Sequence, residues 1–141
     1  MVNLVEIRNK KADYWTKPAI ESAGSLYSTV SDMLKFLKAN LGLSKTKLSP
    51  ALEYCHSTKV EPKIPLSMKF STRLLGVRLS KFRLGWFVYP KENTEIIGHA
   101  GGTEGFTSFM AINPENKSGV VILTNRALRP VDKLGMELLK N

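Results

Sequence analysis

The segment IGHAGGTEGF, residues 97–106, places one histidine among four glycines in a C-terminal half that is otherwise rich in β-prone residues. Glycine inside a strand removes packing contacts, so several glycines together often mark a bulge or a place where a ligand approaches the main chain. His99 is the natural polar contact for such a ligand. The local sequence leaves a second interpretation open, which is a glycine-rich hairpin turn that carries a surface histidine.

Four β-prone runs lie around this segment, at residues 83–89, 94–98, 107–112 and 119–124. Pro90 closes the first run, and the turn-forming residues after it predict a hairpin with the second run. The Asn-Pro-Glu-Asn-Lys-Ser sequence at residues 113–118 is typical of a turn, so the third and fourth runs are predicted to pair antiparallel.

Helical patterns occur on both sides of these strands. Apolar residues recur at helical spacing before Gly42 and predict an amphipathic helix over about residues 29–41. Pro50 opens a shorter predicted helix, residues 50–57, and Pro130 opens a C-terminal helix whose apolar face can cover the sheet. Residues 59–83 contain two prolines among mixed charges and predict an irregular surface segment.

These elements predict an α+β fold, an antiparallel sheet with flanking helices. The chain has 141 residues, of which 43% are hydrophobic, and this suits one globular domain over residues 1–141. No apolar run approaches the about 20 residues that a membrane span needs. Residues 1–11 mix charges with apolar residues, unlike a secretory signal peptide.

Composition weighs against several function classes. The net charge is +9, but the basic residues are spread along the chain rather than gathered with aromatic residues, so no nucleic-acid module is predicted. Cys55 is the one cysteine, which excludes an internal disulfide, and its predicted role is to fill space in the core, as is that of Trp86. His56 lacks partners at ligand spacing and is expected on the surface. We therefore expect no metal site and no cofactor.

Five sequence fragments, in this order along the chain, resemble the serine β-lactamase-like family, and more narrowly its branch of class C β-lactamases, D-alanyl-D-alanine carboxypeptidases and esterases. They lie at residues 23–33, 84–86, 98–102, 112–115 and 121–125. The resemblance runs from about residue 15 to the end and implies the C-terminal part of a β-lactamase/transpeptidase-like fold. The chain then corresponds to a single, partial domain.

The resemblance also implies which motifs of that family this sequence holds. Family members use a serine nucleophile in a Ser-x-x-Lys motif, a tyrosine in a Tyr-x-Asn motif and a third motif, Lys-Thr-Gly or His-x-Gly. His99-Ala100-Gly101 is similar to the third motif, and no Tyr-x-Asn occurs in the 141 residues. Ser44-Lys45-Thr46-Lys47 matches Ser-x-x-Lys formally, but it follows the Gly42 helix stop and is not expected to act as a nucleophile.

The matched positions carry expected roles. Gly101 and Gly102 would let a reacting carbonyl approach the backbone, where an N–H stabilises the oxyanion. His99 would donate a hydrogen bond to a substrate carboxylate or help to move a proton, unless it is purely structural. The remaining candidates for substrate binding are Ala100, Thr103, Asn125, Arg126 and Tyr27.

Each of these further candidates also has a structural interpretation. Asn125 and Arg126 are expected near the free carboxylate of a substrate, or else only end a strand at the surface. Tyr27 either borders the pocket or packs on the following helix. Because lysine at the position of His99 typifies true β-lactamases, esters or D-amino acyl peptides are the expected substrates.

Three function classes remain open. The first is an acyl-transfer hydrolase whose nucleophile lies on an upstream segment, so that this chain is inactive alone. The second is a noncatalytic remnant or binding module for peptidoglycan-like peptides or a protein partner. The third is a basic protein that binds anionic polymers.

The same resemblance predicts an open sheet edge, because the family sheet takes strands from both ends of the chain. An upstream complementary segment or a second copy of the chain is the expected partner at that edge, unless residues 1–14 cover it. Relatives usually work in the periplasm or outside the cell, but this sequence assigns no compartment.

Overall fold

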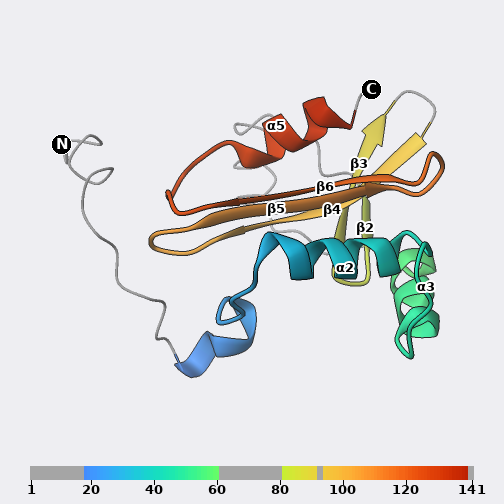
Figure 1. Ribbon diagram of the computed structural model, residues 1–141, viewed down its shortest axis with the longest axis horizontal. Helices are drawn as coiled ribbons and strands as arrows, with labels where there is room; N and C mark the ends of the chain where they lie inside the picture. Colours follow the sequence, from blue (N-terminus) through green and yellow to red (C-terminus); the bar gives the residue numbers. More distant parts are fainter. Residues whose placement is uncertain (1–17, 61–80, 92–93, 140–141) are drawn as a thin grey trace.

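In the part of the chain that the structure describes, a six-stranded antiparallel sheet with the strand order β1-β2-β3-β4-β5-β6 lies at the centre (Figure 1). The computed structural model describes residues 18–60, 81–91 and 94–139. The strands are β1 Lys59–Val60, β2 Lys81–Arg83, β3 Trp86–Lys91, β4 Thr94–Gly102, β5 Thr107–Asn113 and β6 Ser118–Thr124. The helices are η1 Pro18–Ala23, α2 Val30–Asn40, α3 Ser49–Ser57 and α5 Val131–Leu138. The α+β class predicted from the sequence is confirmed.

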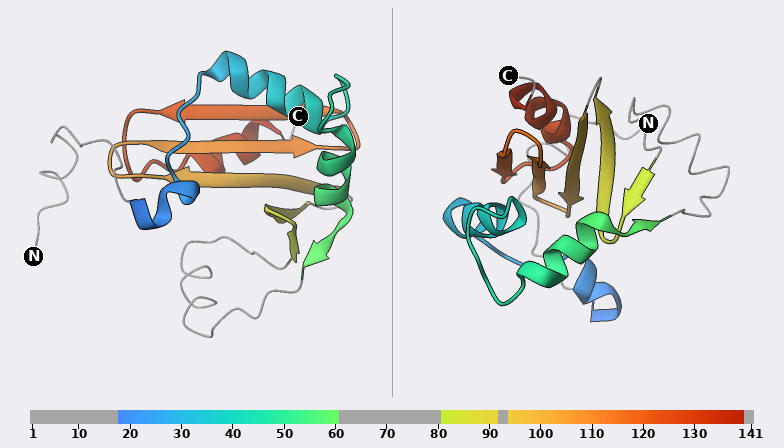
Figure 2. Two further views of the ribbon diagram at one scale, coloured as in Figure 1. Left: turned by 90° about the horizontal axis from the view of Figure 1, so that it is seen from below. Right: turned by 90° about the vertical axis from the view of Figure 1, so that its right-hand side faces the viewer.

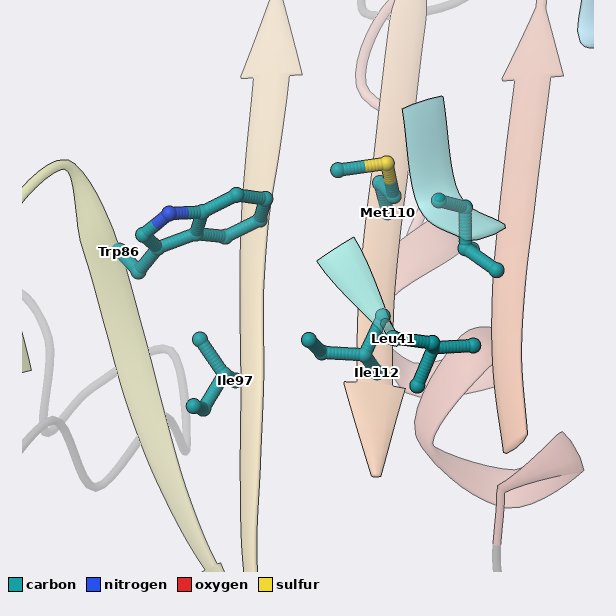
Figure 3. Close-up of a cluster of buried hydrophobic side chains, with 6 residues drawn as sticks. Leu41, Trp86, Ile97, Met110 and Ile112 are labelled. Carbon is teal, nitrogen blue, oxygen red and sulfur yellow. The ribbon is translucent and has the colours of Figure 1, made fainter. Parts of the chain in front are cut away.

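The helices α2 and α5 cover opposite faces of the sheet (Figure 1). On the α2 face, a buried cluster joins the helix to strands β3, β4 and β5 (Figure 3), and its members are Leu37, Leu41, Trp86, Ile97, Met110 and Ile112. On the α5 face, the buried residues are Ile96, Phe109, Ala111, Val131 and Leu139. Alternate residues of β4 and β5 therefore serve two cores, as the period of a strand requires.

The predicted helices are present with small shifts in their ends. Thr29 caps α2, since its hydroxyl accepts a hydrogen bond from the Asp32 N–H at 3.2 Å. Gly42 follows the helix with φ of +70°, a conformation that glycine adopts at little cost. None of the helices in the described part of the chain is long and apolar enough to cross a membrane.

The structure corrects two boundaries of the predicted first hairpin. The run at residues 83–89 is not one strand, because a turn at Gly85, with φ of +79°, separates β2 from β3. Pro90 does not close the strand but lies inside β3, opposite Glu95. Among the described residues, β2 pairs with β3 as far as Val88, so no described strand lies opposite Pro90 on that side.

Two other predicted segments also differ from expectation. The glycine-rich segment is part of β4 as far as Gly102, so its interpretation as a hairpin turn is wrong for His99 and holds only for residues 103–106. The segment at residues 59–83 is not irregular throughout, because its two ends form β1 and β2, which pair with each other. Residues 61–80 lie outside the described part of the chain.

Candidate functional site

His99 lies in the second half of β4, where the strand changes from buried to exposed. Gly98, directly before it, is buried, whereas the His99 side chain is exposed to solvent. The imidazole stacks on the Phe87 ring, with 4.7 Å between ring centroids and 19° between their planes. This contact holds the ring in place, and the exposure leaves it accessible to a ligand.

The end of β4 offers an accessible stretch of backbone. Gly101 pairs with Ser108 and Gly102 with Thr107 in the β4–β5 ladder. A Cβ atom at Gly101 would come within 2.7 Å of the Ser108 hydroxyl oxygen, but one at Gly102 would meet nothing within 4 Å. Thr103 then begins the turn into β5, donating its N–H to the Phe106 carbonyl at 3.0 Å. A ligand can therefore approach the backbone closely at Gly102.

Asn125 and Arg126 follow β6 and lie at the same end of the sheet as Gly102. Thr107 pairs with Gly102 on one side and with Thr124 on the other, so the three strand ends are neighbours. The Thr107 hydroxyl donates a hydrogen bond to the Arg126 carbonyl at 2.8 Å, and the Arg126 N–H donates to the Thr124 hydroxyl at 3.2 Å. Both side chains after β6 are exposed. The backbone that carries them is thus anchored beside the end of β4.

The N-terminus of α2 lies at this end as well, because α2 runs antiparallel to β6. At the far end, Lys117 donates a hydrogen bond from Nζ to the Leu41 carbonyl at 3.1 Å, and Leu37 lies over Gly119. The start of the helix therefore lies near the end of β6 (Figures 1 and 2). Tyr27 precedes the helix by three residues and is largely exposed.

We call this part of the molecule the open end of the sheet. It comprises Tyr27, residues 99–103, Thr107, Asn125 and Arg126. Exposed apolar side chains lie on the same elements, in α2, β6 and the segment before α2, and they include Leu26, Val30, Leu34 and Leu123. Exposed apolar side chains that form a contiguous patch often belong to a binding surface. The structure therefore places the ends of β4 and β6 and the start of α2 at the same end of the sheet.

His56 lies at the other end of α2 and is not the surface histidine that the sequence predicted. Its Nε2 lies 3.0 Å from Oδ1 of Asn40, which in turn donates from Nδ2 to the Phe36 carbonyl at 2.8 Å. Its ring packs edge-on against the Trp86 ring, with 5.6 Å between the ring centroids. Burial lowers the pKa of His56, and the nearby Arg83 charge lowers it further. The Asn40 partner is 16 residues away, so spacing along the sequence could not reveal it.

The other groups near the sheet with a shifted pKa, Glu95 and Tyr89, make contacts within the fold. Glu95 accepts a hydrogen bond from Lys81 at 2.8 Å and another from Arg83 at 2.6 Å, and these bonds lower the pKa of Glu95. Burial and the Asp132 charge raise the pKa of Tyr89 to about 12. Tyr89 packs on the α5 side, away from the face that α2 covers, and it keeps its proton near neutral pH.

The remaining sequence candidates stand as follows. Ser44 and Lys47 are exposed in the loop between α2 and α3, outside any helix, as the sequence indicated. Trp86 is buried and Cys55 packs against the same cluster, which confirms their predicted core positions. Across residues 18–60, 81–91 and 94–139, no three His, Cys, Asp or Glu side chains are grouped so that they could hold a metal ion.

Comparison with known proteins agrees with the resemblance seen in the sequence. The sequence model of the family described as Beta-lactamase matches residues 4–139. The chain is also similar to the Unguisins hydrolase ungD of Aspergillus violaceofuscus (strain CBS 115571), with 30% identity over 122 residues. That match covers 77% of this chain but 20% of the relative, so the chain spans about a fifth of the relative's length.

Proposed function

We propose that this chain, which belongs to the beta-lactamase family, supplies the substrate-side edge of a serine hydrolase site that acts on ester, amide or D-amino acyl peptide bonds. The serine and tyrosine motifs of the family would come from a segment outside these 141 residues, which would then form one partial domain. The observation that carries the proposal is that β4, which carries His99 and Gly102, ends beside the backbone that carries Arg126.

The backbone at Gly102 is the proposed place for the reacting carbonyl. Negative charge develops on the carbonyl oxygen as a tetrahedral intermediate forms, and one well-placed N–H donor contributes about 3 kcal/mol to stabilising it. A substrate oxygen needs close access to the main chain, and the space around Gly102 provides it. A side chain at this position would narrow that access.

His99 and Arg126 are the proposed contacts for the rest of the substrate. The His99 ring is held by Phe87 but exposed, so it can donate a hydrogen bond or pass a proton to a bound ligand. The Arg126 guanidinium can bind a carboxylate through two parallel hydrogen bonds. Its backbone is fixed by Thr107, which pairs directly with Gly102. Asn125, Thr103 and Tyr27 would border the same ligand.

The apolar side chains at the open end favour a second candidate function. Leu26, Val30 and Leu123 are exposed beside the proposed substrate contacts. A binding module that holds a peptide or a protein partner without turnover would use such a surface. Both candidate functions use the same residues, and they differ in whether a nucleophile joins them.

Ligand binding by the purified full chain tests the proposed substrate edge. We expect an acyl-D-alanyl-D-alanine peptide to shift the backbone amide signals of residues 99–103 and 125–126 in NMR spectra. Removing a charge-assisted hydrogen bond in Arg126→Ala should weaken binding about tenfold. Arg129→Ala is the matched control, because Arg129 is another exposed arginine three residues further on, and it should bind normally. Signal changes elsewhere, or equal losses in both variants, would overturn the assignment.

Intact mass measurement after treatment with a fluorophosphonate, and separately with a penicillin, tests where the nucleophile lies. We expect no covalent adduct on the folded chain alone. An adduct would show that this chain holds its own activated serine, with Ser44 as the first residue to replace. A peptide that binds without any adduct would fit either candidate function, and turnover after addition of an upstream family segment would distinguish them.

A further inference from the structure

Phe87 lies where β3 separates from β4. Phe87 and Gly98 form the last pair of the β3–β4 ladder before the turn at Gly85. From His99 to Gly102, β4 pairs among the described residues with β5 alone. Phe87 therefore lies at the point where the proposed substrate-side part of β4 begins.

The sheet fixes the backbone of His99 but not its side chain. Gly98 packs so closely on β5 that a Cβ atom there would lie 2.7 Å from the Ala111 Cβ, and His99 itself pairs with Met110. The His99 side chain is exposed, so the main chain alone would leave its ring free to adopt several rotamers. A side-chain contact is therefore needed to orient the imidazole.

The stack on Phe87 is such a contact. The two ring centroids are 4.7 Å apart and the ring planes differ by 19°, which is close to the parallel stacked arrangement of aromatic pairs. A stacked neighbour covers one face of the imidazole, whereas Nδ1 and Nε2 lie at the edge of the ring. The Phe87 ring can thus fix the plane of the imidazole and leave its hydrogen-bonding atoms open to a ligand.

A second phenylalanine supports Phe87 from β2. Phe82 pairs directly with Phe87 in the β2–β3 ladder, and their rings meet edge-on, with 5.3 Å between centroids and 73° between planes. Lys81 and Arg83, on either side of Phe82, both form ion pairs with Glu95 of β4. The contacts therefore run from Phe82 through Phe87 to His99, and the ion pairs hold β2 to β4 beside them.

We propose that Phe87 is a positioning residue for His99 and that Phe82 keeps the Phe87 ring in place. A ligand that binds to an already oriented imidazole immobilises fewer side-chain rotamers, so Phe87 strengthens binding without touching the ligand. This inference rests on the proposed function, because it takes His99 as a substrate contact. It adds two residues, Phe82 and Phe87, that the resemblance did not indicate.

NMR spectra of the ligand-free full chain test the orientation of the His99 ring. The ring current of a stacked phenyl group moves imidazole proton signals upfield, so Phe87→Leu should return the His99 signals toward those of a free histidine. Phe87→Tyr keeps an aromatic ring and should retain the upfield positions. Phe36→Leu is the matched control, because Phe36 is a partly exposed phenylalanine on α2, and it should leave the His99 signals unchanged. Circular dichroism would verify that the variants are folded.

Binding of an acyl-D-alanyl-D-alanine peptide tests the consequence of that orientation. We expect Phe87→Leu to weaken binding about three- to tenfold, and Phe87→Tyr to bind as the unmodified chain does. In a His99→Ala background, Phe87→Leu should cause no further loss, because Phe87 acts through His99. Phe82→Leu should weaken binding by a smaller factor, since it removes only the support of the Phe87 ring.

Two results would overturn the positioning role. One is a set of His99 signals that does not respond to Phe87→Leu. The other is an equal loss of binding on Phe87→Leu with and without His99, because Phe87 would then contact the ligand or support the fold generally. If the unmodified chain binds no peptide although its His99 signals respond to Phe87→Leu, the proposed substrate edge is wrong, and with it the contribution of Phe87 to binding.

Discussion

The two ends of α2 differ in how far the sheet buries their apolar side chains. Near its C-terminus, Leu37 and Leu41 are buried and belong to the cluster that includes Trp86. Figure 3 shows Leu41 in this cluster. Near its N-terminus, Val30 and Leu34 continue the same apolar stripe but remain exposed. The apolar pattern is the same along the helix. The difference in exposure therefore comes from how much of the described chain packs over each end. The candidate site residues lie where that cover ends.

The two histidines of the chain show the same contrast. His56 is half-buried at the covered end, with a hydrogen bond to Asn40 and an edge contact with Trp86. His99 stacks on Phe87 but is exposed at the open end. An aromatic neighbour therefore does not distinguish a structural histidine from an available one. The combination of burial and a polar partner does.

The largest expected effect comes from shortening a leucine at each end of α2. Leu37→Ala should cost about 2–5 kcal/mol of unfolding free energy, because the side chain is 4% exposed and a cavity would remain. Leu34→Ala, one turn earlier, should cost less than about 1 kcal/mol of unfolding free energy, since little packing is lost. Urea unfolding of dilute protein measures both. Equal losses would show that the two ends are covered alike.

Replacing two glycines of β4 with alanine compares a crowded position and an open position on one strand. At Gly98 the new methyl would lie 2.7 Å from the Ala111 Cβ and 2.8 Å from the Met110 carbonyl oxygen, so Gly98→Ala should cost about 1–3 kcal/mol. Gly102→Ala enters open space and should leave stability within about 0.5 kcal/mol. Thermal unfolding of the two variants is the measurement. A stable Gly98→Ala protein would mean that β4 and β5 can separate without penalty.

The end of β4 shows what the sequence predicts and what it leaves out. Periodicity and turn residues predicted α2, α5 and the β5–β6 hairpin, because each of these depends on contacts between residues close in sequence. They did not predict that β4 continues through Gly101 and Gly102, since local propensity disfavours glycine in strands and only pairing with β5 holds them there.

The sequence indicated which residues belong to the candidate site but not how they are arranged in space. The resemblance indicated His99 and Arg126 separately, and the Thr107 pairings bring their strand ends together. The short strand β2 and the position of Pro90 depend on which strand lies alongside, and no local pattern carries that information. His56 was assigned wrongly for a similar reason, because its partner comes from another helix.

The smallest expected effect is a pH dependence of stability that arises from His56, at the C-terminal end of α2. Burial lowers the pKa of His56 below its ordinary value of 6.5, so the folded protein favours the neutral ring more than the unfolded chain does. As the pH falls through about 6.5, the unfolded chain takes up a proton first, and stability decreases until the folded state is protonated too. The melting temperature should therefore fall between about pH 7 and pH 5.

The variant His56→Gln should flatten that slope, because its side chain can donate to Asn40 but does not titrate. His99→Gln changes the other histidine and should retain the slope, since His56 is still present. Glu95 contributes in a separate range: its pKa lies below 4.5, so the stability that it adds is lost only as the pH falls further. The opposite result, a melting temperature that still falls with pH in His56→Gln but not in His99→Gln, would show that His56 is not the source of the pH dependence.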